Sequence, residues 1–245
     1  MKNYQPAQNL LQDRVILVTG AGQSIGRTAA LAFASHGATV ILHGRKVEKL
    51  EAVYDEIEAA GWPQAAIFPL DLFSAGDKDF EALATGIRRQ FSRLDGILHN
   101  ASHLDGLRSL EEHTLEQWQV SLRVNLMAPF ALTRACLPLL KASPDASILM
   151  TSETHGHAPA AYWGSFAVSK AAGEVLVKMW AQELELHPNL RINGIVPGPV
   201  QSTQRVRTHP GEVLESLPLP ETLMSQYLYL MGSDSRGVSG QIVEC

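Results

Sequence analysis

The sequence predicts an α/β protein with a doubly wound parallel sheet of about seven strands and helices on both faces. Short runs that are apolar throughout, such as RVILVT at 14–19, are typical of strands buried on both sides. Longer segments with helical spacing separate these runs, and the alternation of strand and helix repeats about six times. Because no linker, low-complexity stretch or internal repeat interrupts the 245 residues, we expect one domain over 1–245.

The individual elements follow from the same patterns. Strands are expected at 14–19, 37–44, 66–71, 95–100, 147–152, 191–197 and 241–244, where the residues are apolar and often β-branched. Helices are expected at 25–37, 47–61, 80–91, 115–140 and 164–186, where apolar residues recur with helical spacing. Gly37 and Gly61 fall where the ends of helices favour glycine.

Composition narrows the function classes. The net charge of −5 argues against a nucleic-acid partner, and no cluster of Lys and Arg indicates a membrane surface. The apolar runs are far shorter than the ~18 residues of a membrane span, and the polar start MKNYQPAQNLLQDR lacks the apolar region of a signal peptide. Two cysteines, Cys136 and Cys245, do not make a disulfide framework. We therefore expect a cytoplasmic protein with no nucleic-acid partner, no membrane partner and no metal site.

A glycine-rich turn follows the first predicted strand. In TGAGQSIG, at 19–26, Gly20, Gly22 and Gly26 allow a tight turn and leave backbone N–H groups free to face an anion. The helix that begins there adds about half a positive charge at its N-terminus. The turn therefore predicts a pyrophosphate site, and the alternative is a glycine turn without a ligand.

The second strand ends in HGRK, at 43–46. NAD-binding proteins of this architecture usually place Asp or Glu here against the ribose 2′-hydroxyl, whereas this chain has Gly44 followed by Arg45. A guanidinium pairs with a 2′-phosphate that a carboxylate would repel. NADP(H) is therefore favoured over NAD(H), and the alternative is a solvated arginine.

The sequence resembles the short-chain dehydrogenase/reductase family over nearly its whole length. The resemblance rests on TGAGQSIG, LDL, LHNAS, RVNLM, VSKAA and IVPGPV, which occur in the family's order and spacing. It implies a Rossmann-type fold, a nicotinamide cofactor and hydride transfer to or from the carbonyl or alcohol of a small-molecule substrate. It also implies a homodimer or homotetramer that forms through the helices 115–140 and 164–186.

The resemblance also assigns cofactor-binding positions. Asp71 and Leu72 are expected at the adenine, whereas Pro197, Gly198 and Val200 are expected at the nicotinamide. The full set that the resemblance implies is Gly20, Gly22, Ser24, Ile25, Gly26, Arg45, Asp71, Leu72, Asn100, Ala101, Lys170, Pro197, Gly198, Val200 and Ser202. Ser24 stands where the family has a glycine close to the pyrophosphate, so its side chain either crowds the phosphate or is accommodated.

The catalytic tetrad that the resemblance implies is incomplete. The family uses a serine, a tyrosine, a lysine four residues after the tyrosine, and an asparagine. Asn125 and Lys170 are present, but Phe166 stands at the tyrosine position and Glu153 at the serine position. Ser152 is one residue out of register, which turns its side chain toward the other face. The ordinary serine–tyrosine–lysine mechanism is therefore not expected.

Four nearby residues are possible substitutes. Tyr162 lies eight residues before Lys170, about two helical turns away. His155 and His157 are either general acids above the substrate or exposed loop histidines. Glu153 either points to solvent or lies near Lys170, where a carboxylate would pair with the lysine and favour the oxidised cofactor.

Two functions remain open. One is an NADP(H)-binding oxidoreductase with an incomplete proton relay, and the alternative is a catalytically silent cofactor-binding sensor or a scaffold. The segment 202–223 follows the Pro-Gly turn and is expected to select the substrate. Within it, Arg205 and Arg207 either hold an anionic substrate or are solvated.

Overall fold

The computed structural model describes residues 4–245, within which seven parallel strands form one sheet in the order β3-β2-β1-β4-β5-β6-β7. All seven expected strands are present, with ends that differ from the expected ones by a few residues. Their bounds are Val15–Thr19 for β1, Thr39–Gly44 for β2, Ala66–Pro69 for β3, Gly96–His99 for β4, Ala146–Thr151 for β5, Leu190–Val196 for β6 and Ile242–Glu244 for β7.

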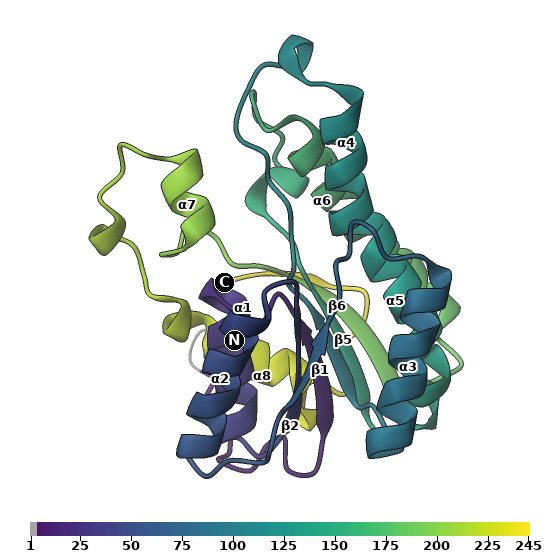
Figure 1. Ribbon diagram of the computed structural model, residues 1–245. Helices are drawn as coiled ribbons and strands as arrows, with labels where there is room; N and C mark the ends of the chain where they lie inside the picture. Colours follow the sequence, from purple (N-terminus) through teal and green to yellow (C-terminus); the bar gives the residue numbers. More distant parts are fainter. Residues whose placement is uncertain (1–3) are drawn as a thin grey trace.

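Helices cover both faces of the sheet (Figure 1). One face packs against α1 (Ser24–Ser35), α2 (Val47–Ala59) and α8 (Met224–Met231), and the other against α3 (Asp77–Phe91), α5 (Ala128–Ala142) and α6 (Gly164–Glu183). Each face has its own cluster of buried side chains, because strands such as Val15–Thr19 are buried on both sides. The predicted doubly wound fold is confirmed.

The long helix expected over 115–140 is interrupted. It divides into α4 (Leu115–Leu122), a π-helical segment at Arg123–Met127, and α5. Pro129 follows this segment and has no N–H to donate to the carbonyl four residues earlier, which belongs to Asn125. The interruption therefore falls at a position that the sequence had assigned to the catalytic tetrad.

Two helices were not expected from the sequence. The helix α8 is buried nearly all round, so its residues lack the one-sided pattern from which an amphipathic helix is recognised. The short helix α7 (Thr203–Thr208) lies outside the layers formed by the sheet and its helices. The segment 202–223, which contains α7, extends away from the sheet (Figure 1). It forms one wall of the site described below.

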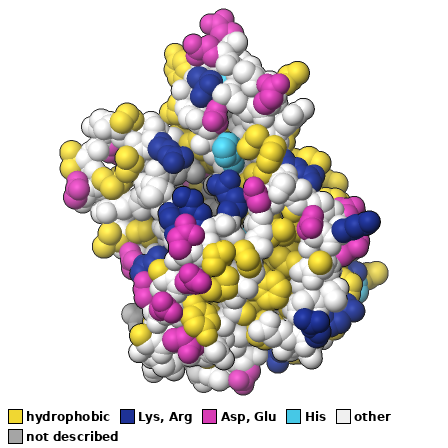
Figure 2. All heavy atoms as spheres, in the orientation of Figure 1, with side chains coloured by type: hydrophobic (Ala, Val, Ile, Leu, Met, Phe, Trp, Pro, Cys, Tyr) yellow, Lys and Arg dark blue, Asp and Glu magenta, His cyan; other side chains and the backbone are white. Residues whose placement is uncertain are grey.

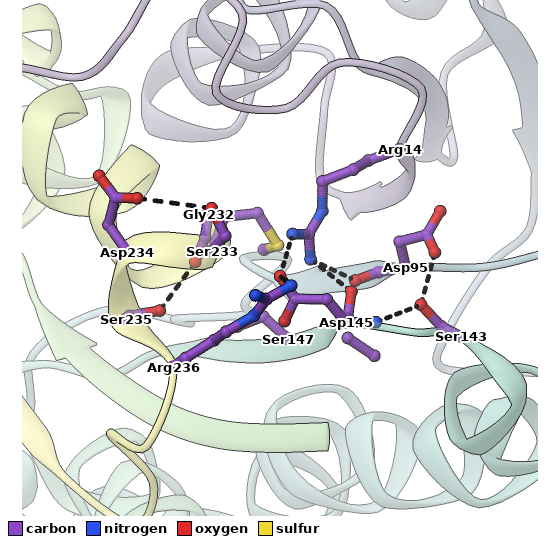
Figure 3. Close-up of polar contacts among 12 residues, drawn as sticks. Arg14, Asp95, Ser143, Asp145, Ser147, Gly232, Ser233, Asp234, Ser235 and Arg236 are labelled. Carbon is purple, nitrogen blue, oxygen red and sulfur yellow. Dashed lines mark hydrogen bonds and ion pairs between the residues drawn. The ribbon is translucent and has the colours of Figure 1, made fainter. Parts of the chain in front are cut away.

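A buried ionic network joins the amino-terminal ends of the strands (Figure 3). Asp145 accepts a 2.9 Å hydrogen bond from Arg14 and pairs with Arg191, whose guanidinium also donates to the carbonyl of Gly232 at 2.6 Å. Asp95 accepts from the backbone N–H of Val15 at 2.8 Å. These contacts fasten β1, β4, β5 and β6 together at the edge opposite the site.

None of the helices in residues 4–245 is long and apolar enough to cross a membrane.

Candidate functional site

A cleft of about 710 Å³ lies at the carboxyl ends of the strands, where the strand order reverses between β1 and β4. Parallel α/β sheets bind ligands at this point, and the volume falls within the range of small-molecule sites. The walls come from the glycine-rich turn, the ends of β2, β4 and β5, the helix α6 and the lobe that carries α7. Figure 2 shows Lys and Arg side chains gathered in the hollow between the two upper lobes.

The cleft brings together nearly all of the predicted site residues. Gly26 and Asn125 do not line it and lie directly behind its wall. The predicted residues that line it are Gly20, Gly22, Ser24, Ile25, Arg45, Asp71, Leu72, Asn100, Ala101, Glu153, Phe166, Lys170, Pro197, Gly198, Val200 and Ser202.

The glycine-rich turn is shaped for close contact. Gly20 has a φ of +70°, and a Cβ there would lie 3.0 Å from the Cα of Ala101. A Cβ on Gly26 would lie 2.1 Å from the carbonyl oxygen of Gly20, so this glycine allows α1 to pack against the turn. The Thr19 hydroxyl fixes the facing segment, because it accepts from the backbone N–H groups of Asn100 and Ala101 at 3.0 and 3.1 Å. The backbone therefore leaves an open cradle at the N-terminus of α1.

Ser24 occupies a left-handed backbone position, with a φ of +47°. Such a conformation costs a residue with a side chain about 1 kcal/mol relative to glycine. The Ser24 hydroxyl lies 3.5 Å from the hydroxyl of Thr203 and accepts from the Thr203 backbone N–H at 3.4 Å. The side chain that replaces the family's glycine thus contacts the first residue of α7.

Arg45 is exposed at the end of β2 and has no ion-pair partner within residues 4–245. The glycine before it, Gly44, brings no carboxylate to the place where NAD-binding proteins use one. Asp71 is turned to its own loop, where it accepts from the backbone N–H of Phe73 at 3.1 Å. Together with the open glycine cradle, these residues fit a phosphorylated dinucleotide.

Lys170 reaches the cleft from the middle of a buried helix. Its Nζ donates to the carbonyl of Thr151 at 2.8 Å and lies 5.5 Å from the centre of the Phe166 ring. Burial lowers the pKa of Lys170 to about 8, while the charges of Glu153 and Glu174 act in the opposite direction. The ammonium is therefore held by a carbonyl and an aromatic face instead of by a tyrosine hydroxyl.

Phe166 is 2 % exposed and belongs to a small apolar cluster with Trp163 and Ala167, against which Leu104 and Leu107 pack. The ring of Trp163 lies 5.9 Å from that of Phe166. Tyr162, the nearest tyrosine, is 59 % exposed and has a φ of +74°, and it does not line the cleft. In this structure Tyr162 does not replace the missing hydroxyl.

Asn125 is fixed by three hydrogen bonds. Its amide oxygen accepts from the backbone N–H of His103 at 2.7 Å, and its amide nitrogen donates to the His103 carbonyl at 3.0 Å and to the Ser169 hydroxyl at 2.9 Å. Asn125 and Lys170 both line a cavity of about 10 Å³, which is close to the space that one water molecule needs. The π-helical segment thus holds the asparagine directly behind the lysine.

Glu153 fits neither of its two expected positions, an ion pair with Lys170 or a carboxylate that points to solvent. Its carboxylate accepts from the backbone N–H of His155 at 2.7 Å and makes no salt bridge to Lys170, although its charge raises the pKa of that lysine. Glu153 therefore acts on Lys170 through the electrostatic effect of its charge, while its carboxylate is hydrogen-bonded within its own loop.

Neither loop histidine lines the cleft. The ring of His155 contacts that of Trp163 in a tilted arrangement, with ring centres 4.2 Å apart, so it is not simply exposed. His157 pairs with Glu174 at 3.3 Å and with Glu244 at 3.2 Å. Ser152, which the register was expected to turn away from the site, lines the cleft, and its hydroxyl donates to Glu174 at 2.5 Å. His155 thus belongs to the packing beside the cleft, whereas His157 is exposed, as one of the two alternatives had it.

Sequence reasoning missed several residues of the site. His103 and Thr203 line the cleft, Ser169 bonds to Asn125, and Glu174 lies one helical turn after Lys170. The spacing of Glu174 from Lys170 was readable in the sequence, because residues four apart share a helix face. The others depend on contacts between distant segments.

Among residues 4–245, no group of three or more His, Cys, Asp or Glu residues is placed to hold a metal ion.

Comparison with known proteins gives concordant matches. The family model described as short chain dehydrogenase matches residues 14–212. The uncharacterized oxidoreductase YciK of Escherichia coli K12 is 42% identical over 238 residues, which cover 97% of this chain and 94% of that protein.

Solved structures match equally well. A short chain dehydrogenase from Salmonella enterica serovar Typhi is 41% identical with a TM-score of 0.96, over 98% of this chain and 99% of that one. A protein from Escherichia coli CFT073, solved in complex with NADPH, is 42% identical with a TM-score of 0.94, over 98% and 99% of the two chains.

Proposed function

This chain belongs to the short-chain dehydrogenase family, and on that premise we propose that it binds NADP(H) in the cleft and acts on a carbonyl or alcohol without a tyrosine proton donor. The observation that carries the proposal is the contrast around Lys170. The lysine, Asn125 and the cofactor cradle are all in position, while the place of the tyrosine hydroxyl is filled by the buried ring of Phe166.

The preference for NADP(H) is supported by Arg45, which has no carboxylate beside it at the end of β2. A relative that is 42% identical was solved with NADPH. When bound, the cofactor supplies the hydride chemistry at its nicotinamide ring. The glycine-rich turn and the N-terminus of α1 would hold the pyrophosphate, and Arg45 would pair with the 2′-phosphate.

The remaining residues of the chain would position the other groups. Asp71 and Leu72 would lie at the adenine, and Asn100 and Ala101 along the ribose. Pro197, Gly198, Val200 and Ser202 would border the nicotinamide, with Lys170 on its ribose. Because Phe166 has no proton to give, a water molecule would have to transfer the proton, and turnover would be slow.

A second function is favoured by the packing of Phe166. The ring is 2 % exposed within its own apolar cluster, so the site is stable without a hydroxyl. This supports a protein that binds NADP(H) and does not turn over, as a sensor or a scaffold would.

The single-domain organisation over 1–245 and the cytoplasmic location also remain predictions.

The first experiment is a fluorescence titration with NADPH, NADP⁺ and NADH, followed by turnover of NADPH with a panel of carbonyl compounds. We expect binding with a preference for the phosphorylated cofactors and slow turnover. Restoring the hydroxyls in the double variant Phe166→Tyr with Glu153→Ser should raise turnover by about 10²-fold or more, because general acid catalysis is worth 10²–10⁴-fold.

The control is the same double variant with Lys170→Met, which should lose the gain. Binding of NADPH without any turnover, in the wild type and in the double variant, would favour the sensor or scaffold. The absence of binding to all three cofactors at millimolar concentration would contradict both functions.

A further inference from the structure

The lobe that carries α7 borders the phosphate end of the cleft. Ser202 caps α7 by accepting from the backbone N–H of Arg205 at 3.1 Å. The next residue, Thr203, lies against the glycine-rich turn, where Gln23 donates to its hydroxyl at 3.4 Å and Ser24 contacts it at 3.5 Å. The helix α7 is therefore anchored at the turn that would hold the cofactor's pyrophosphate.

The two arginines of α7 are in different environments. Arg205 is paired with both carboxylate oxygens of Glu212, at 2.5 and 2.8 Å, so its charge is balanced within the lobe. Arg207 also lines the cleft but makes no hydrogen bond or ion pair with any residue in 4–245. A guanidinium that faces a cleft without a partner is free to pair with an anionic ligand.

Arg45, the other arginine of the cleft without a partner in residues 4–245, lines the same cleft as Arg207. His103 also lines this cleft, and its backbone is fixed by Asn125. Burial lowers the pKa of His103, Asp105 opposes this effect, and the charges of Arg45 and Arg207 lower the pKa further. Both arginines therefore act on the same imidazole. Lys46 and Lys49 line the same end of the cleft, so positive charge accumulates there.

We propose that Arg207 is a second cation for the 2′-phosphate of NADP(H), so that α7 closes on the phosphorylated cofactor together with Arg45. The inference rests on the proposed function and adds a residue that selects between NADP(H) and NAD(H). The phosphate of the cofactor is favoured over an anionic substrate group for two reasons. Arg207 lines the same cleft as Arg45, and α7 is anchored on the phosphate turn, where Gln23 bonds both to Thr203 of α7 and to Lys49 of α2.

The test compares Arg207→Gln with Arg205→Gln, which removes the same charge from the same helix at a position that is already paired. Affinities for NADPH, NADH and adenosine 2′,5′-bisphosphate are measured by fluorescence and calorimetry at two salt concentrations. Arg207→Gln should weaken NADPH and the bisphosphate about tenfold, as expected for the loss of one charge-assisted contact, and leave NADH within about twofold. Arg205→Gln should leave the ratio of NADPH to NADH affinity unchanged.

Three outcomes would overturn the proposal. Unchanged NADPH affinity in Arg207→Gln would assign the arginine to an anionic substrate or to no ligand. Equal weakening of NADPH and NADH would assign it to the pyrophosphate or to the shape of the lobe. If the wild-type protein binds no cofactor at all, the proposed function falls as well, whereas the first two outcomes leave that function intact.

Discussion

At the scale of single residues, the proposed function depends on the surroundings of Lys170. Lys170 bonds to the Thr151 carbonyl and lies over the Phe166 ring, so its ammonium is stabilised in the absence of the tyrosine. Glu153 and Glu174 offset part of the effect of burial on the lysine pKa. Under the proposed function Phe166 and Glu153 act together, because Phe166 has no proton to donate and Glu153 adds a negative charge that acts on Lys170.

Glu153→Gln should lower the pKa of Lys170 below its value of about 8, because the carboxylate favours the charged lysine and the amide does not. The measurement is an NMR pH titration of ¹³C-labelled lysine side chains. Glu174→Gln should act in the same direction, whereas Glu116→Gln, at an exposed position on α4, should have no effect. A Lys170 titration that is unchanged in both site variants would contradict this account.

At the scale of elements, α6 presents one face to the site and another to solvent. Val168, Val175 and Met179 are 45 %, 55 % and 52 % exposed on the outer face of α6. Met127 and Phe130, which are 49 % and 39 % exposed, lie where the π-helical segment meets α5. Exposed apolar residues on the helices 115–140 and 164–186 support the predicted homodimer or homotetramer through these helices.

Val175→Asp should convert the oligomer to smaller species, because a charge at the centre of an apolar interface cannot be hydrated. Size-exclusion chromatography with light scattering measures the mass in solution. The control is Val213→Asp, at an exposed apolar position in the lobe beyond α7, which should not change the mass. A wild-type protein that is monomeric at all concentrations tested would show that this interface does not form.

At the scale of the whole molecule, the two edges of the sheet have opposite roles. The amino-terminal edge is fastened by the buried network of Arg14, Asp95 and Asp145 (Figure 3), to which Arg191 adds an ion pair with Asp145. Burial raises the pKa of Asp145, but Arg191 and Arg14 outweigh that effect and lower it overall. The carboxyl-terminal edge borders the cleft. The strands are thus held together by the ionic network at one edge and bear the binding residues at the other.

Acid should unfold the protein partly through His43 and His99, which are buried at the ends of β2 and β4. Burial lowers the pKa of His43 to about 4 and of His99 to about 3, below the ~6.5 of an exposed histidine. Between the lowered pKa values of the folded protein and about 6.5, these two histidines bind more protons in the unfolded chain than in the folded protein. Their contribution to stability is therefore constant above about pH 6.5 and falls as the pH decreases toward 4. His43 alone should contribute a loss of about 3 kcal/mol.

Urea unfolding at a series of pH values, without cofactor, tests this expectation. His43→Leu should flatten the pH dependence and stabilise the fold, because neither ring nitrogen of His43 has a hydrogen-bond partner within residues 4–245. His187→Gln, at a half-buried position in a loop, should preserve the wild-type slope. A slope that is equally steep in His43→Leu would exclude this histidine as a source of acid sensitivity.

The sequence by itself predicted the strands, the sheet and the residues at its carboxyl edge. Each strand was recognisable because burial on both faces requires an unbroken apolar run, as in Val15–Thr19. Gly20 and Asn100 follow parallel strands, which end at one edge of the sheet, and the family resemblance added Lys170 from a helix; all three line one cleft. The absence of a hydroxyl at Phe166 was likewise visible from the four-residue spacing on a helix.

Only the tertiary structure decided which polar groups are already paired. Arg205 and Arg207 are indistinguishable in sequence, but Glu212 pairs with Arg205 alone. Glu153 was expected either to pair with Lys170 or to point to solvent, yet its carboxylate is held by the backbone of its own loop. Pairings of this kind depend on the directions of side chains from separate segments, which no local periodicity records. The sequence therefore predicts which residues line the cleft, whereas the fold decides which of their polar groups are already paired.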